Sequence, residues 1–171
     1  DSSNYFNGVI DEVRIYGRAL SVSEIKGLYG TGSVIVGGAE KTAVKSGLVA
    51  HWTFNGNDVV WSSGTAGTVY DRVGGYNGTM GNVTQAGSPV PGKLGQAFHF
   101  RSSAYVDLGS SSALNPSNVT ISAWVKPGDF SGNYTYIYSN ARDCCDNEDG
   151  INVRIKSNNK VNTQIWNSGT F

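Results

Sequence analysis

The chain has 171 residues, of which 13 are basic and 13 acidic, so its formal net charge at pH 7 is +0. This balance argues against nucleic acid as a partner, and no apolar run is long enough to span a membrane. Glycine contributes 23 residues, aromatic residues make up 11% and charged residues only 15% of the chain. Such a composition predicts an all-β fold with many turns.

The first predicted elements are a strand and a capped helix. A β-branched run over 8–16 predicts a half-buried strand. Ser21 and Glu24 then form an S-x-x-E capping box, in which each side chain satisfies a backbone N–H at the start of a helix. Ile25 and Leu28 give this helix a short apolar face.

Asp11 and Glu12 are adjacent acidic residues inside the predicted strand. Neighbouring residues of a strand point to opposite faces, whereas a glycosidase needs two carboxylates that flank one bond. We therefore expect no catalytic pair here. Asp11 is predicted to hold a turn, a bulge or a structural cation, and Glu12 is predicted to face solvent.

Residues 48–54 alternate between apolar and polar positions, which predicts a strand with Trp52 on one face and His51 on the other. A turn-rich stretch follows over 55–88. His51 and His99 are expected to be packed or surface residues, because no nucleophile or metal-ligand spacing accompanies them.

Two later strands carry most of the aromatic candidates. Residues 118–127 alternate strongly, and Trp124 is expected to serve packing there. Over 134–139, alternation places three tyrosines on one face. They would form a sugar-stacking platform if exposed, or else line a cavity between sheets or a subunit contact. The candidate ligand-binding residues are Tyr134, Tyr136, Tyr138, Trp61 and Trp166.

The acidic stretch ARDCCDNEDG spans 141–150. It does not fit an EF-hand loop, but Asp146 and Asp149 form a candidate loose Ca²⁺ loop. Cys144 and Cys145 are adjacent, so a bridge between them would be strained. They are predicted to be either a vicinal disulfide or two reduced thiols. Zinc is not expected, because no second thiol pair or histidine pair accompanies them.

Three stretches share a pattern with one known family: FNGVIDEVRIYGRALSVSEIKGLY (6–29), GLVAHWTFNGNDVV (47–60) and PGKLGQAFHF (91–100). They resemble the closing strand and helix, the opening strand and a later strand of a laminin-G-like, or concanavalin A-like, domain of bacterial surface-protein type. The resemblance implies an antiparallel β-sandwich of jelly-roll type with one short helix near the N-terminus. It also implies structural Ca²⁺, with Asp11, Asn55 and Asp71 as candidate ligands.

The order of these stretches implies that the chain crosses two repeats. Residues 1–30 would be the C-terminal strand and helix of one laminin-G-like repeat, 31–46 a linker, and 47–171 the N-terminal and central part of the next. Since the first and last strands of the family are neighbours, we expect the strand at 8–16 to pair beside 48–54. The donor of that strand is either this chain or a neighbouring copy.

No nucleophile–base pair, phosphate loop or zinc spacing is visible, so the chain is not expected to be an enzyme. The resemblance implies an extracellular, cell-surface repeat that mediates adhesion through a glycan or a surface protein. One alternative is a structural subunit of a filament or repeat array, in which copies join by strand exchange. Another is an accessory module of a polysaccharide-degrading enzyme.

Overall fold

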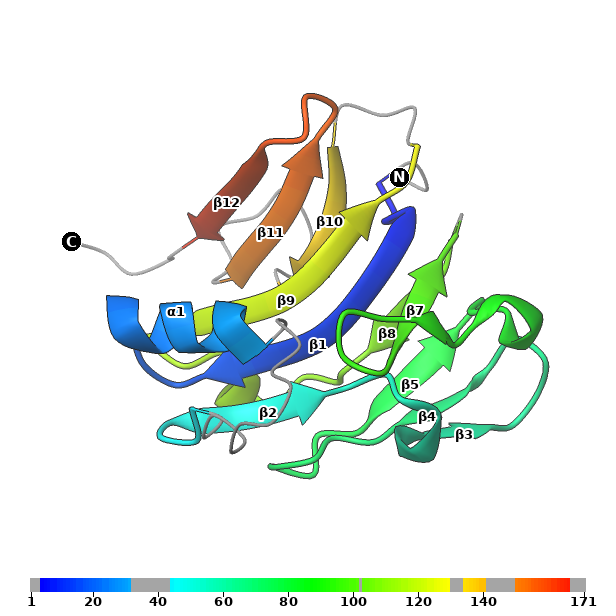
Figure 1. The fold of residues 1–171 in the computed structure, drawn as a ribbon, viewed down its shortest axis with the longest axis horizontal. Helices are drawn as coiled ribbons and strands as arrows, with labels where there is room; N and C mark the ends of the chain where they lie inside the picture. The colour runs from blue at the N-terminus through cyan, green and yellow to red at the C-terminus, as the bar shows by residue number, and fades with distance from the viewer. Residues whose placement is uncertain (1–3, 32–43, 102, 130–133, 141–149, 167–171) are drawn as a thin grey trace.

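The structure is a computed structural model that describes residues 4–31, 44–101, 103–129, 134–140 and 150–166. The protein is mostly β-structure, with antiparallel sheets and one α-helix near the N-terminus (Figure 1). The predicted all-β class is confirmed at this level. The helix and strands are α1 (Val22–Thr31), β1 (Gly8–Tyr16), β2 (Leu48–Trp52), β3 (Val59–Trp61), β4 (Gly67–Val69), β5 (Gly78–Gly81), β6 (Val90–Pro91), β7 (Gln96–Phe100), β8 (Tyr105–Asp107), β9 (Thr120–Pro127), β10 (Tyr134–Ser139), β11 (Gly150–Lys156) and β12 (Val161–Trp166).

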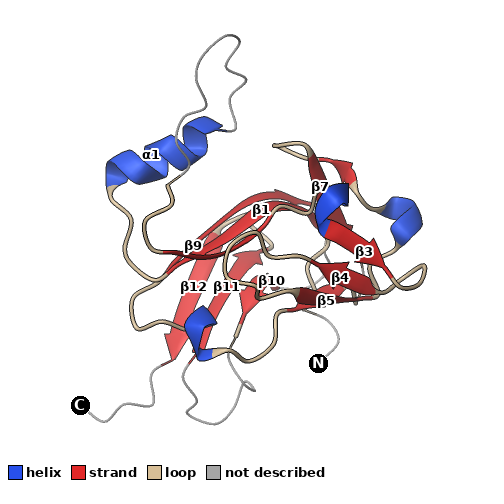
Figure 2. Cartoon of the chain, turned by 90° about the horizontal axis from the view of Figure 1, so that it is seen from below, coloured by secondary structure: helices blue, strands red, loops and turns tan. Residues whose placement is uncertain are grey.

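In the described part of the chain the strands form three sheets. The largest is built around β1, which pairs with β9 along one edge and with β2 and β7 along the other, with β6 beyond β7. A second sheet has the order β3-β4-β5-β8, and a third the order β10-β11-β12. Helix α1 covers one side of β1 and β9, and the sheet β10–β12 lies on their other side (Figure 2).

The expected pairing of the strand at 8–16 with residues 48–54 is confirmed, and it occurs within this one chain. Val13 lies opposite Trp52, and Ile15 lies opposite Ala50. On its other edge β1 runs antiparallel to β9, where Ile15 lies opposite Ile121. The strand that comes first in the chain is therefore the central strand of the largest sheet.

A β-bulge interrupts β1 at Asp11 and Glu12. The register against β9 shifts between Asp11 and Arg14, and Glu12 has a φ of 57°, in the left-handed region. Because a bulge breaks the alternation of side chains, Asp11 and Glu12 both turn toward the face of β1 that α1 covers. The prediction of opposite faces was therefore wrong. The prediction that Glu12 faces solvent was wrong too, since it is only 4% exposed.

The hydrophobic core lies on the opposite face of β1. Ile15, Trp52 and Phe98 are almost fully buried there, and the rings of Phe54 and Phe98 stack at 4.9 Å. Burying a side chain of this size stabilises a fold by roughly 1.5–3 kcal/mol. The face of residues 48–54 that carries Trp52 is thus the face that packs into the core.

The capping box at the start of α1 is confirmed. The backbone N–H of Ser21 donates to Glu24 Oε2 at 2.8 Å, and that of Glu24 donates to Ser21 Oγ at 3.3 Å. The predicted apolar face is only half right, because Leu28 is 8% exposed but Ile25 is 51% exposed. Ile25 therefore contributes little to docking the helix.

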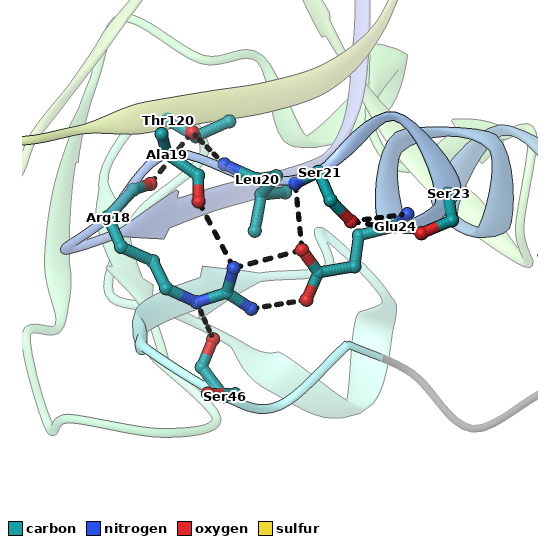
Figure 3. A network of polar contacts seen from close by, with 8 residues as sticks. All are labelled: Arg18, Ala19, Leu20, Ser21, Ser23, Glu24, Ser46 and Thr120. Atoms are coloured by element: carbon teal, nitrogen blue, oxygen red, sulfur yellow. Dashed lines mark hydrogen bonds and ion pairs between the residues drawn. The ribbon is translucent and has the colours of Figure 1, made fainter.

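A polar network fixes this helix to two distant segments (Figure 3). The guanidinium of Arg18 donates to both carboxylate oxygens of Glu24, at 2.9 and 2.5 Å, and to Ser46 O at 2.9 Å. Thr120 of β9 donates its hydroxyl to Arg18 O at 2.8 Å. The turn between β1 and α1 is thus tied both to the residue before Gly47 and to the largest sheet.

Candidate functional site

A cavity of about 810 Å³ lies between the face of β1 that carries the core and the strands β8 and β10. Its floor is apolar and includes Trp52, Phe54 and Phe100. Five tyrosines also line it: Tyr5, Tyr105, Tyr134, Tyr136 and Tyr138. A concave, mostly apolar site with a few polar groups is typical of a small-molecule pocket.

The tyrosines of β10 do not all lie on one face. Tyr136 lies opposite Arg154 in the neighbouring strand, but Tyr138 lies opposite Val153, because the register shifts between the two tyrosines. Arg154 and Val153 are consecutive, so they point to opposite faces. The prediction of one shared face was therefore wrong, although all three tyrosines of β10 line the cavity.

Tyr134 and Tyr136 form a pair that Arg154 holds in place. Their rings lie edge to face with centroids 5.5 Å apart, and the Arg154 guanidinium lies 4.4 Å from the centre of the Tyr134 ring. The N–H of Tyr136 also donates to Asn4 O at 3.0 Å. These contacts pre-organise two aromatic rings at the cavity.

Tyr138 is buried and keeps its proton well above neutral pH. Burial raises the pKa of its hydroxyl to about 12, and the hydroxyl donates to Leu114 O at 3.3 Å. Burial also raises the pKa of Tyr136. Both hydroxyls are therefore neutral hydrogen-bonding groups at pH 7. Other polar residues of the lining include Asn4, Asp107, Ser111, Asn115 and Asn140.

The two tryptophans proposed from the sequence are not part of this lining. Trp61, on β3, is partly buried and packs against the core, with its ring centroid 6.0 Å from that of Phe98. Trp166 ends β12, and its side chain lies outside the described residues. Trp124, expected to serve packing, lies on the α1 side of β9 with its ring 5.4 Å from that of Tyr29.

The candidate calcium ligands each hold a loop. Asp71 accepts four backbone N–H groups, from His51, Val73, Gly74 and Tyr76, at 2.8–3.0 Å. A carboxylate has about four lone-pair sites, so these bonds fill it. The pattern is that of a carboxylate that organises a turn.

Asp11 and Asn55 hold one and the same turn, at residues 92–96. Oδ2 of Asp11 accepts from the N–H groups of Lys93 and Leu94, at 2.7 and 2.9 Å, and Asn55 Oδ1 accepts from Gln96 N at 2.7 Å. The predicted role of Asp11 in holding a turn is confirmed. Its Oδ1 is buried without a partner among the described residues, and burial raises the pKa of this carboxyl.

Other predicted site residues lie outside the described residues: Cys144, Cys145, Asp146 and Asp149. Within the residues that the structure does describe, no three histidine, cysteine or carboxylate side chains gather in a way that could hold a metal ion. Structural calcium stays a prediction.

A buried cluster of charged residues on the α1 side of the largest sheet was not predicted from the sequence. Glu12 Oε2 accepts from Arg14 Nη2 and lies 2.9 Å from His51 Nε2. Glu12 and Arg14 are two residues apart, a spacing that places side chains on one face of a strand. The spacing of Glu12 and Arg14 could have indicated an ion pair. The position of His51 beside them could not be predicted without the register between β1 and β2.

No family model, curated protein or solved structure matches this chain. Among the described residues, no helix has the length and apolar character needed to cross a membrane.

Proposed function

We propose that this protein is a non-catalytic, extracellular binding module with a laminin-G-like jelly-roll sandwich, and that it binds a glycan in the tyrosine-lined cavity. The support for this proposal is the size and the aromatic lining of the cavity. Its volume of about 810 Å³ falls within the usual range of ligand pockets, about 300–1,000 Å³. Aromatic rings offer flat apolar surfaces for the faces of sugar rings, while tyrosine hydroxyls and amides can bond sugar hydroxyls.

Titration with a panel of neutral oligosaccharides tests this function. Trp52 lines the cavity, so its fluorescence should change on binding. Tyr136→Ala should weaken binding by up to about tenfold, because one aromatic contact is worth roughly 0.5–1.5 kcal/mol. Tyr70→Ala is the matched control, since Tyr70 is exposed and outside the lining. Equal affinities of the two variants would exclude the cavity as the binding site.

The resemblance to laminin-G-like domains also supports structural calcium at the turn that Asp11 and Asn55 hold, where Asp11 Oδ1 has no partner among the described residues. If a calcium ion binds there, the midpoint of thermal unfolding should rise in calcium and fall in EDTA. Asp11→Asn should abolish the difference. An identical midpoint in both solutions would remove calcium from the proposal.

A structural role through strand exchange is the second candidate, and the position of β1 favours it. β1 is paired on both edges but is separated from β2 by residues 17–47. A neighbouring copy could therefore supply an identical β1 and α1. Light scattering with calcium and then with EDTA separates the candidates. A monomer in both solutions argues for the binding module, and oligomers that grow with concentration argue for exchange.

A further inference from the structure

A second hollow, of about 460 Å³, lies beside the C-terminal half of β1 and the start of β2. It shares no lining residue with the tyrosine-lined cavity. Three cations, one histidine and two apolar residues line it: Arg14, Lys45, Arg72, His51, Leu48 and Val73. A hollow with this lining favours a ligand that has both a negative charge and a carbon skeleton.

Arg14 is the buried member of this lining. It is 7% exposed, and its backbone lies opposite that of His51, so the two side chains share a face. Within the described residues, its guanidinium donates to Glu12 alone. An arginine carries five N–H donors. The donors of Arg14 that Glu12 does not use remain accessible from the hollow, where a ligand can accept hydrogen bonds from them.

The carboxylates around the hollow are already engaged. Glu12 is shared by Arg14 and His51. Asp58 accepts from Arg72 at 2.5 Å and from Thr53 Oγ1 at 2.5 Å. As described above, the Asp71 carboxylate is filled by backbone N–H groups. The free donors of Arg14 therefore have no nearby protein carboxylate left to bind.

Lys45 adds a positive charge that has no ion-pair partner among the described residues. Lys45 is therefore the one cation of the lining that is paired with no carboxylate among the described residues. An unpaired cation of this kind can pair with a ligand that carries a negative charge. The planar fork of an arginine fits the two oxygens of a carboxylate in particular.

We propose that this hollow binds a small organic acid, with the ligand carboxylate held between Arg14 and Lys45. Leu48 and Val73 contact the carbon skeleton, and His51 and Arg72 border the carboxylate. A monosaccharide that carries a carboxylate has this chemistry and fits a volume of this size. This site is separate from the proposed glycan cavity and does not depend on it.

The chain has two histidines, which makes proton NMR a direct test. His51 lines the hollow, whereas His99 lies elsewhere, beside Arg101. Sodium glucuronate, added to the full chain at constant pH and ionic strength, should give a saturable shift of the His51 ring signals and leave those of His99 unmoved. Glucose, which lacks the carboxylate, should move neither.

Two variants locate the binding. Lys45→Ala removes an exposed side chain and should weaken glucuronate binding about tenfold, the loss expected for one charge-assisted contact. Lys160→Ala, in the turn between β11 and β12, is the matched control and should bind like the parent chain. Arg14→Lys keeps the charge but loses the fork, so it should bind more weakly still, with far-UV circular dichroism to confirm folding.

Several results would overturn the proposal. One is the absence of a saturable shift at His51, and another is an equal response to glucose. Unchanged affinity in Lys45→Ala would exclude the assigned cation. Sodium sulfate that binds as tightly as glucuronate would overturn the assignment of a carboxylate, since a planar group would then have no advantage.

Discussion

The N-terminal strand and the C-terminal sheet are attached to the rest of the protein in different ways. β1 shares backbone hydrogen bonds with β9 on one edge and with β2 and β7 on the other. In the described part of the chain, the sheet β10–β12 is joined to the other strands by the Tyr5–Tyr136 bridge, the Tyr138 hydrogen bond and apolar packing. We therefore expect the C-terminal sheet to open at a lower cost in free energy than β1.

The largest expected difference in stability is between two truncations, one isoleucine from each region. Ile15 of β1 is fully buried, whereas Ile165 of β12 is 71% exposed. Ile15→Ala should lower the free energy of unfolding by about 2–5 kcal/mol, because it leaves a cavity in the core. Ile165→Ala should change it by less than about 0.5 kcal/mol. Urea unfolding measures both, and equal losses would contradict the comparison.

An alkaline titration tests how firmly Tyr138 holds the C-terminal sheet. Its pKa is about 12 in the folded chain, against 10.0 for a free tyrosine. Between these values only the unfolded chain releases the proton, so the free energy of unfolding should fall as pH rises from about 10 to about 12. Tyr138→Phe should remove most of this decline. A decline of the same size in that variant would mean that other groups cause it.

The smallest expected effect concerns the cap of α1. Ser21→Ala removes the acceptor for the N–H of Glu24 and should cost about 1 kcal/mol in urea unfolding. Ser23→Ala is the control, because Ser23 is exposed and only its hydroxyl contact with Ser21 is lost. It should change stability by less than about 0.5 kcal/mol.

The same cap should respond to acid. Hydrogen bonds from Arg18 and from Ser21 lower the pKa of Glu24 from 4.5 to about 2. The folded chain keeps this carboxylate ionised while the unfolded chain takes up a proton, so stability should be lost as pH falls from about 4.5 to about 2. Arg18→Gln should flatten this part of the pH profile, and an unchanged slope would contradict the assignment.

Local features of the fold could be predicted from the sequence. The spacing of Ser21 and Glu24 is sufficient to specify the cap, because both bonds lie within one helical turn. The alternation of 48–54 was enough to put Trp52 and His51 on different faces of a strand, and the resemblance was enough to pair β1 with β2. In each case the relevant contacts follow from periodicity or from a known strand order.

Features that depend on a bulge were predicted wrongly. The bulge at Glu12 turns two carboxylates toward one face, and the shift in β10 separates Tyr138 from Tyr136. One extra residue in a strand moves every later side chain to the opposite face of the sheet from the one that simple alternation predicts. A bulge was one of three roles predicted for Asp11, but the sequence did not choose among them and gave no sign of the shift in β10. The orientation of Glu12 and the division of the tyrosines therefore required the structure.

The central position of β1 has a consequence for synthesis of the protein. Tyr16 lies opposite Thr120, so β1 is made about 100 residues before its partner β9. At roughly 5–20 residues per second, β1 must wait about 5–20 seconds for that partner. During this interval β2 and β7 can pair with one edge of β1, but the edge that β9 will cover has no partner in its own chain and is open to pairing with other nascent chains. Ribosomes that translate one message in close succession would thus create the conditions under which a strand pairs with the wrong copy.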